Sequence, residues 1–200
     1  LRLLVRPLRK RDYVAAQHID HLIANSTHIQ QDIATYYDRE STVIHPPIEL
    51  EQFLPIAAGR PRKVTPKQPR CVVWGRQVPY KRTDLVIAAC NQLKLPLTII
   101  GDGPAIPQLK AMAGDTITFT GFIDDDERNK IIAESDLFIA PQFEDFGVAP
   151  VEALAAGIPV IAYQAGGALD YIVGGKTGVF FKEQTVESVV AAIKKVRTMT

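Results

Sequence analysis

Two glutamates, Glu144 and Glu152, stand eight positions apart on either side of a turn that contains Gly147. The turn follows a very apolar run at residues 137–140 and precedes a helix expected at Val151–Ala156. Open α/β sheets bind ligands outside the carboxyl ends of their strands, which is where both acids are placed. Gly147 lets the backbone come close to a ligand, and the N-terminus of the following helix favours an anion. The pattern is therefore typical of a site for a sugar attached to a diphosphate.

Two cations, Arg76 and Lys81, lie in the loop that follows another apolar run, at residues 71–74. A guanidinium binds a diphosphate as a fork and an ammonium binds it as a point charge, so the pair could clamp this group. The alternative is an ordinary solvated loop. The neighbouring Arg82 is assigned to the surface or to an ion pair.

Three further turns follow apolar runs. Gly101 and Gly103 permit a tight turn, but they do not complete the GxGxxG pattern, so a nicotinamide dinucleotide site is not predicted. Phe122 or Ile123 could present a backbone edge to a nucleotide base, or Phe122 could lie in the core. Gly166 and Gly167 either offer amides to a phosphate or form a simple turn.

Glu152 also has a purely structural interpretation. A Glu at the third position of a helix often caps it, and Glu152 would occupy that position if Pro150 were the first helical residue. No metal site is predicted, because the four histidines lack metal-ligand spacing. They are His18, His21, His28 and His45.

The elements that must position these turns alternate between strand and helix from Arg70 onward. The strands are apolar without alternation, which indicates burial on both faces and hence a parallel sheet covered by helices. Right-handed crossovers then give an α/β fold with a Rossmann-like, doubly wound parallel sheet. Strands are expected at Cys71–Trp74, Leu97–Ile100, Ile117–Thr120, Leu137–Ala140, Val160–Tyr163 and Val179–Phe181, and helices at Asp84–Leu93, Ala105–Met112, Asp126–Glu134, Val151–Ala156, after Gly167 and at Thr185–Val196.

The chain before residue 70 has a different rhythm. Residues 1–20 are basic and helix-like, with Pro7 expected to break the pattern, and they could pack on other chain or lie on a membrane surface. Short strands are expected near residues 21–25 and 42–44, with a helix between them that Ser26 caps. Residues 46–69 hold six of the fourteen prolines, so this segment is expected to be a linker or an irregular crossing.

Composition sets the outer limits of these interpretations. The 200 residues have 46% hydrophobic and 22% charged side chains, as in a soluble globular protein. The net charge of +1 does not favour nucleic acid as a partner, and no run of 18 apolar residues is present to span a membrane. Cys71 and Cys90 are read as buried thiols of a reducing compartment. A start at Leu1 and an end inside a helical pattern suggest an excised piece of a longer protein.

Taken together, these residues resemble the carboxy-terminal lobe of the GT-B glycosyltransferases of family 4, also called group 1. The resemblance covers residues 70–199. The sequences of the motifs are most similar to those of bacterial mannosyltransferases of this family. The resemblance implies three parts, namely a remnant of an amino-terminal lobe at residues 1–45, an interlobe segment at 46–69 and a nucleotide-sugar-binding lobe at 70–200. The motifs that carry it are Gly75-Arg76 with Lys81, Gly101-Asp-Gly-Pro104, Glu144-Asp-Phe-Gly147 with Glu152, the stretch 153–160, and Gly166-Gly167.

The resemblance implies a retaining transferase that uses a nucleotide-diphosphate sugar, with GDP-mannose preferred and UDP-sugars as the alternative. Arg76 and Lys81 would neutralise the leaving diphosphate electrostatically, so neither a metal nor another cofactor is expected. Glu144 would contact the donor sugar, and Glu152 would accept hydrogen bonds from the ribose. The expected catalytic residues are Arg76, Lys81 and Glu144, and the donor-binding residues are Gly75, Gly101, Gly103, Phe122, Phe146, Gly147, Val148, Glu152, Gly166 and Gly167.

The expected partners are the sugar nucleotide and a glycan or lipid-linked acceptor, the latter bound by an amino-terminal lobe that is nearly all missing from the chain. The expected location is cytoplasmic. The cytoplasmic face of the membrane, with peripheral membrane contact in the full-length protein, is an option. Two alternatives remain, a nucleotide-sugar-binding module without catalysis and a GT-B-like epimerase or phosphorylase.

Overall fold

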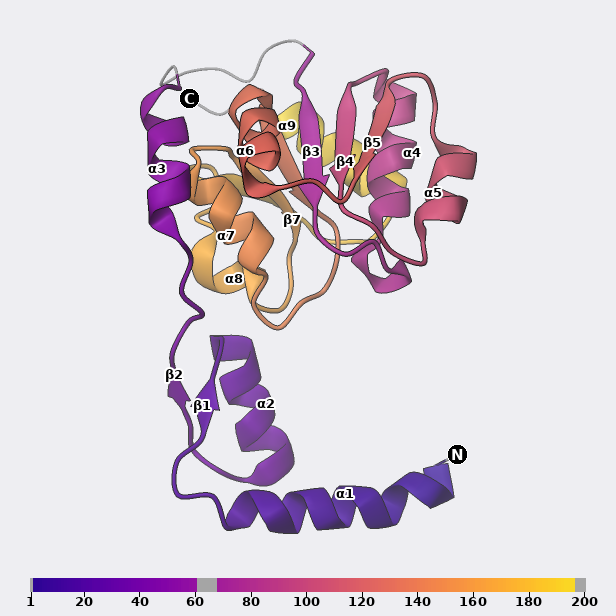
Figure 1. The fold of residues 1–200 in the computed structure, drawn as a ribbon. Coiled ribbons are helices and arrows are strands. Elements are labelled where there is room, and N and C mark those ends of the chain that lie inside the picture. Colours follow the sequence, from indigo (N-terminus) through magenta and orange to yellow (C-terminus); the bar gives the residue numbers. More distant parts are fainter. Residues whose placement is uncertain (1, 61–67, 197–200) are drawn as a thin grey trace. The chain divides into compact units, whose positions relative to one another are not determined.

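A computed structural model describes residues 2–60 and 68–196 (Figure 1). The chain divides into two compact units, one that ends at Pro47 and one that begins at Ile48, and each is described by itself.

The first unit consists of two helices and a pair of short parallel strands. Ser26 begins the second helix, because its side chain accepts a hydrogen bond from the Ile29 amide at 3.2 Å. Pro7 lies inside the first helix rather than ending it, which corrects the expected break. Pro7 lies in the second turn and lacks the N–H that would donate to the carbonyl four residues earlier, yet the helix continues past it to Gln17. The elements are α1 (Arg2–Gln17), β1 (Ile23–Ala24), α2 (Thr27–Tyr37) and β2 (Thr42–Val43).

The second unit is built on a six-stranded parallel sheet with the strand order β5-β4-β3-β6-β7-β8. The inner strands are buried along their whole length, as their uninterrupted apolar residues predict. The strands are β3 (Cys71–Trp74), β4 (Leu97–Ile100), β5 (Ile117–Gly121), β6 (Leu137–Ala140), β7 (Val160–Tyr163) and β8 (Gly178–Phe181).

Helices cover both faces of this sheet, which confirms the doubly wound Rossmann-like fold. Buried residues of α4, α5 and α9 form one apolar cluster with one face of the strands, and those of α3, α6, α7 and α8 form a second cluster with the other face. The helices are α3 (Leu50–Ala58), α4 (Thr83–Leu93), α5 (Ile106–Met112), α6 (Asp125–Glu134), α7 (Val148–Ala155), α8 (Ala168–Tyr171) and α9 (Val186–Val196), and a 3₁₀ turn spans Pro79–Lys81.

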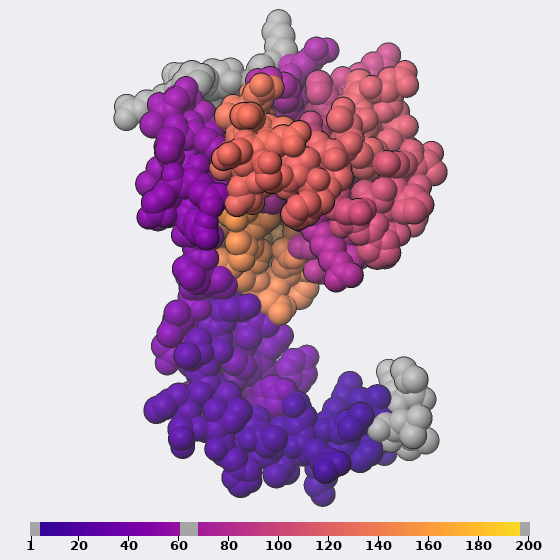
Figure 2. All heavy atoms as spheres, in the orientation of Figure 1, coloured from indigo at the N-terminus to yellow at the C-terminus, as the bar shows by residue number. Residues whose placement is uncertain are grey.

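Helix α3 lies within the proline-rich segment that was expected to be irregular. Its Phe53 is only 1% exposed and packs in the cluster with α6 and α7, while the Arg128 guanidinium lies 5.6 Å from the centre of the Phe53 ring. Figure 2 shows α3 beside α6 on the surface of this unit. Burial of an aromatic ring has thus stabilised a helix in a segment where the prolines favour irregular structure. Residues 61–67 of the same segment lie outside the described residues.

The strand order reverses between β3 and β6, which pair directly with each other. One side of β3 leads to β4 and β5, and the other side of β6 leads to β7 and β8. This is the topological switch point, and the loops after β3 and β6 diverge above it, where α/β sheets bind ligands. Across residues 2–60 and 68–196, the structure contains no helix with both the length and the apolar character of a membrane span.

Candidate functional site

An ion pair bridges the switch point. Lys81 comes from the loop after β3 and Glu144 from the loop after β6, and the Lys81 Nζ contacts the Glu144 Oε1. Their side chains are only 23% and 19% exposed, so solvent screens this pair less than it screens a surface salt bridge. The fold therefore brings together one cation and one acid that lie 63 positions apart in the sequence.

Arg76 lies on the same side of the switch point as Lys81, in the turn directly after β3. Its side chain is exposed, and it forms no ion pair with any residue in the described part of the chain. Arg76 and Lys81 both line a shallow crevice over the junction of β3 and β6, together with Gln142 and Trp74. The crevice has a volume of about 20 Å³, so a diphosphate would lie over it rather than inside it.

Glu144 is held by a second partner and lies beside the start of α7. The Gln142 side chain donates to Glu144 Oε2 at 3.0 Å. Gly147 is the N-cap of α7 with φ 94°, and a Cβ built there would lie 3.3 Å from Glu144 Oε2 and 2.8 Å from Tyr171 Oη. A side chain at this position would therefore be strained and would press on both groups.

Tyr171 is the nearest neighbour of this turn from α8. Its ring packs edge-on against Phe146, with 5.5 Å between centroids. Burial, and then the negative charges of Glu144 and Asp170, raise the pKa of Tyr171 above its ordinary value. The hydroxyl is thus held protonated close to the α7 N-terminus.

Glu152 accepts a hydrogen bond at 2.9 Å from the indole nitrogen of Trp74, at the end of β3. Helix α7 begins at Val148, three residues earlier than the expected Val151, so Glu152 lies in the second turn. The capping interpretation is consequently wrong. The Trp74 ring packs against Phe138 with 4.4 Å between centroids, which fixes the donor that orients Glu152.

The glycines after β4 and β7 let neighbouring turns approach each other. A Cβ on Gly101 would lie 2.2 Å from the Gly75 carbonyl oxygen, and one on Gly103 would lie 2.2 Å from that of Gln77. Their contribution in this structure is close packing between the turns after β3 and β4.

Gly166 and Gly167 act in the same way on the Glu144 turn. A Cβ on Gly166 would lie 2.3 Å from the Glu144 carbonyl oxygen, and the Gly167 amide donates to that oxygen at 2.9 Å. This amide is already used within the protein, and α8 is a single turn of four residues. The pair therefore supports the position of Glu144.

The aromatic candidates separate into one exposed and one buried residue. Phe122, directly after β5, is 89% exposed, so its assignment to the core is wrong. Phe146 is buried and can meet a ligand only through its backbone. Val148, the first residue of α7, has an exposed side chain.

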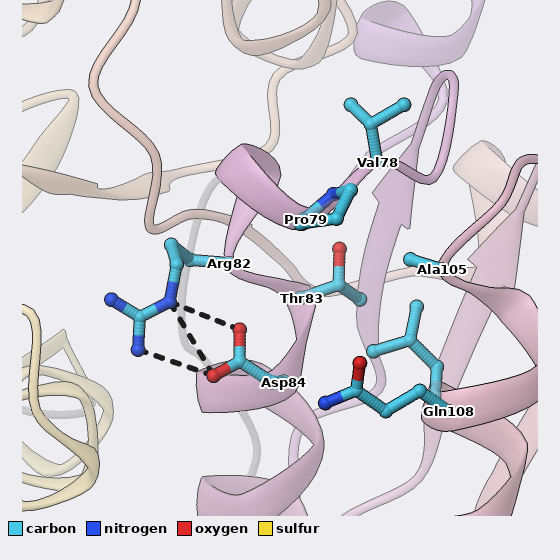
Figure 3. Close-up of a pocket in the computed structure, with 8 residues that line it drawn as sticks. Val78, Pro79, Arg82, Thr83, Asp84, Ala105 and Gln108 are labelled. Atoms are coloured by element: carbon cyan, nitrogen blue, oxygen red, sulfur yellow. Dashed lines mark hydrogen bonds and ion pairs between the residues drawn. The ribbon is translucent and has the colours of Figure 1, made fainter.

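A larger pocket of about 160 Å³ lies between the loop after β3 and helix α5 (Figure 3). The Arg82–Asp84 ion pair, with 3.1 Å between Nε and Oδ1, lies among its lining residues and confirms the expected role of Arg82. Arg76, Lys81 and Glu144 do not line this pocket, and we do not assign it to the site. Within the described ranges, no group of three or more His, Cys, Asp or Glu residues could hold a metal ion.

The sequence interpretation missed four residues that orient the others. Trp74, Gln77, Gln142 and Tyr171 each touch a predicted site residue or its backbone. A tryptophan at a strand end and two glutamines beside charged loop residues were the available signals. Their partners lie up to 78 positions away, and no local pattern encodes that distance.

Comparison with protein families gives one match. The family described as "Glycosyl transferases group 1" matches residues 60–199. A GDP-mannose-dependent alpha-(1-6)-phosphatidylinositol monomannoside mannosyltransferase from Mycobacterium tuberculosis is 31% identical over 170 residues, which cover 74% of this chain and 44% of that protein. A GDP-mannose-dependent alpha-mannosyltransferase from Corynebacterium glutamicum is 37% identical over 105 residues, which cover 52% of this chain and 25% of that protein.

Solved structures share the fold. A sucrose-phosphate synthase from Thermosynechococcus elongatus matches 94% of this chain and 51% of its own with a TM-score of 0.79 at 24% identity. The HepE protein of Anabaena, solved with UDP and glucose, matches 88% of this chain and 52% of its own with a TM-score of 0.73 at 21% identity. The chain thus spans less than half the length of the curated relatives named above.

Proposed function

Because this chain belongs to the group 1 glycosyl transferases, we propose that it is the donor-binding part of a retaining glycosyltransferase. The proposed reaction moves a hexose from a nucleotide-diphosphate sugar to a glycan or lipid-linked acceptor. GDP-mannose is the preferred donor, since the relatives with that specificity are about one-third identical. The observation that carries the proposal is the Lys81–Glu144 ion pair across the switch point, with Arg76 in the same crevice.

In this proposal the two cations stabilise charge that develops on the diphosphate. When the bond between the sugar and the diphosphate breaks, negative charge builds up on the phosphate oxygens. Arg76 has no competing ion pair in the described part of the chain, and Lys81 has three donors, so it can bind phosphate while it holds Glu144. The N-terminus of α7, whose cap residue Gly147 makes no side-chain cap hydrogen bond, adds to the attraction.

The two acids hold the hydroxylated ends of the donor. Glu144, fixed by Lys81 and Gln142, accepts hydrogen bonds from the sugar, and Glu152, fixed by Trp74, accepts them from the ribose. Phe122 offers an exposed ring to the base. The acceptor hydroxyl attacks the oxocarbenium-like sugar on the face from which the diphosphate leaves, and the leaving phosphate takes up the proton of this hydroxyl. Attack on that face explains why the configuration of the sugar is retained. Glu144 is accordingly a contact to the sugar and not a nucleophile.

The acceptor belongs to the part of such an enzyme that this chain does not include. We propose that residues 1–45 are the remnant of the amino-terminal lobe, that the segment from residue 46 is the crossing between lobes, and that the reaction occurs at the cytoplasmic face of a membrane. The isolated chain then binds donor nucleotide weakly and does not turn over. Efficient sugar transfer by the 200-residue chain alone would contradict this division.

Titration calorimetry of the 200-residue chain with GDP, UDP and ADP tests the donor site. Arg76→Ala and Lys81→Ala should each weaken binding by about 1.5–3 kcal/mol, the scale of hydrogen bonds to charged groups. Lys130→Ala, on the exposed surface of α6, is the matched control and should bind as the parent does. GDP should bind more tightly than UDP or ADP. If neither substitution changes the affinity, Arg76 and Lys81 do not bind the diphosphate and their assignment is wrong.

The same titration with EDTA tests for a metal. We expect the affinity for GDP to remain unchanged, because Arg76 and Lys81 supply the positive charge. Abolition of binding by the chelator would show that a metal ion carries the diphosphate.

A further inference from the structure

A buried glutamine lies between the proposed phosphate-binding residues. Gln77 follows Arg76 directly and is only 3% exposed, although it belongs to a loop. Its side-chain amide donates to the Gly75 carbonyl oxygen at 2.9 Å and to the Ile100 carbonyl oxygen at 3.4 Å, and its Oε1 accepts a hydrogen bond from the Thr83 hydroxyl at 2.8 Å. A buried amide that satisfies donor and acceptor at once specifies one loop conformation.

The partners fix which way this amide points. The two carbonyl oxygens can only accept, so the NH₂ group must face them and Oε1 must face Thr83. Thr83 is the first residue of α4 and is itself buried. Figure 3 shows it between the loop after β3 and Ala105. The network therefore links the end of β3, the end of β4 and the start of α4.

The main chain of Gln77 is held as well. Its amide donates to the Asp102 carbonyl oxygen at 2.9 Å, and its carbonyl oxygen accepts from the Ala105 amide at 3.1 Å. Arg76 thus stands between two residues whose peptide groups are fixed by neighbouring loops. Its own side chain remains exposed and without an ion pair in the described part of the chain.

The Gly75 carbonyl belongs to the peptide bond that joins Gly75 to Arg76. In a planar trans peptide the N–H points opposite to the C=O, so the bond from Gln77 turns the Arg76 N–H away from Gln77. Among the described residues this N–H has no acceptor. A Cβ on Gly75, where φ is 122°, would meet no atom within 4 Å, so the space on that side of the Gly75 Cα is open.

We propose that Gln77, oriented by Thr83, is a positioning residue that presents the Arg76 N–H and guanidinium together to the donor diphosphate. This inference rests on the proposed function, because it assigns Arg76 to the diphosphate. The gain is preorganisation, since the loop is ordered before the ligand arrives and less entropy is lost on binding.

The test is titration calorimetry of the 200-residue chain with GDP, accompanied by urea unfolding of every variant. Gln77→Leu should weaken binding about tenfold, and Thr83→Val about threefold. Thr83→Ser, which retains the hydroxyl, should restore the parent affinity. Gln108→Leu removes an exposed glutamine on α5 and is the matched control, with no expected change in affinity.

Coupling to Arg76 separates positioning from a general structural role. In the Arg76→Ala background, Gln77→Leu should lower the logarithm of the affinity for GDP by less than half as much as it does in the parent. An equal cost in both backgrounds, or a folded Gln77→Leu chain that binds GDP as the parent does, would overturn the inference. If Gln77→Leu does not fold, the Thr83→Val and Thr83→Ser pair decides by the same comparison. If Arg76→Ala alone has no effect, the assignment of Arg76 to the diphosphate fails and the inference fails with it, whereas the proposed function fails only if Lys81→Ala also has no effect.

Discussion

The charged residues at the switch point have unequal freedom, and this difference suggests different tasks. Lys81 is held by Glu144, and Glu152 is held by Trp74, so both are oriented without a ligand. Arg76 is positioned only through the hydrogen-bonded neighbours Gly75 and Gln77, and its guanidinium is exposed. In the proposed function, a planar fork on a fixed main chain suits a phosphate whose exact position changes as a bond breaks.

Tyr171 provides a prediction about pH at this scale. Its pKa in the folded chain is raised above the value near 10 of an unfolded tyrosine, chiefly by burial. The folded chain therefore keeps this proton after the unfolded chain has released it. The stability linked to Tyr171 is complete below about pH 10 and is lost as the pH rises above that value, by at most about 1.4 kcal/mol per pH unit.

Urea unfolding at pH 9 and pH 11 of the parent and of Tyr171→Phe measures this effect. Other titrating groups are common to both chains, so the difference between them reports Tyr171. The parent should lose more stability than the variant over this interval. Equal losses in the two chains would show that the hydroxyl titrates normally.

Among the elements, the glycine-containing turns pack closely against neighbouring turns, a role that the sequence interpretation did not assign to them. The turn after β4 fits against the turn after β3, and the turn after β7 fits against the turn after β6, at distances that leave no room for a Cβ. The α7 N-terminus and Glu144 are thus positioned by a neighbouring loop as well as by their own strand.

Gly167 allows this packing to be tested without backbone strain. Its φ of −65° suits any residue, but a Cβ there would lie 2.3 Å from the Phe146 Cα. Gly167→Ala should therefore lower the free energy of unfolding by about 1–3 kcal/mol or more, as overpacking does. Gly174→Ala is the control, since its Cβ would meet only Phe180 Cδ2, at 3.9 Å, and should change stability by less than about 0.5 kcal/mol. Equal unfolding midpoints for the two variants would contradict the packing argument.

The elements also show how far the sequence could predict this structure. Continuous apolar runs placed the six strands to within about a residue, because burial on both faces leaves a local signal. Helix α3 was missed because local proline signals conflict with the burial of Phe53 against distant helices. The early start of α7 was missed because Gly147, not Pro150, ends the turn. The Trp74–Glu152 contact depends on the pairing of β3 with β6, which no local pattern contains.

At the scale of the whole molecule, the two units differ in the size of their cores. The second unit has two large apolar clusters, one on each face of its sheet. In the described part of the first unit, the buried residues are Ala16, Ala24 and Ser26. Such small burial supplies little of the free energy that must oppose chain entropy.

Native-state hydrogen exchange, followed by mass spectrometry, should reveal this imbalance. Amides of α2 should exchange on the order of a hundredfold faster than those of β6, because local opening of the first unit exposes little apolar surface. Peptides from β6 serve as the internal reference for global unfolding. Exchange of α2 at the rate of β6 would mean that the two units unfold as one.

The interlocked turns have a consequence for laboratory evolution of the second unit. An insertion after β3 or β6 would drive a carbonyl oxygen into the adjacent glycine turn, so length variation in one loop calls for a compensating change in its neighbour. Libraries built to change the proposed donor specificity are better made from point substitutions at outward-facing positions. Phe122 and Val148 meet that requirement, since both side chains border solvent, one directly after β5 and the other at the start of α7.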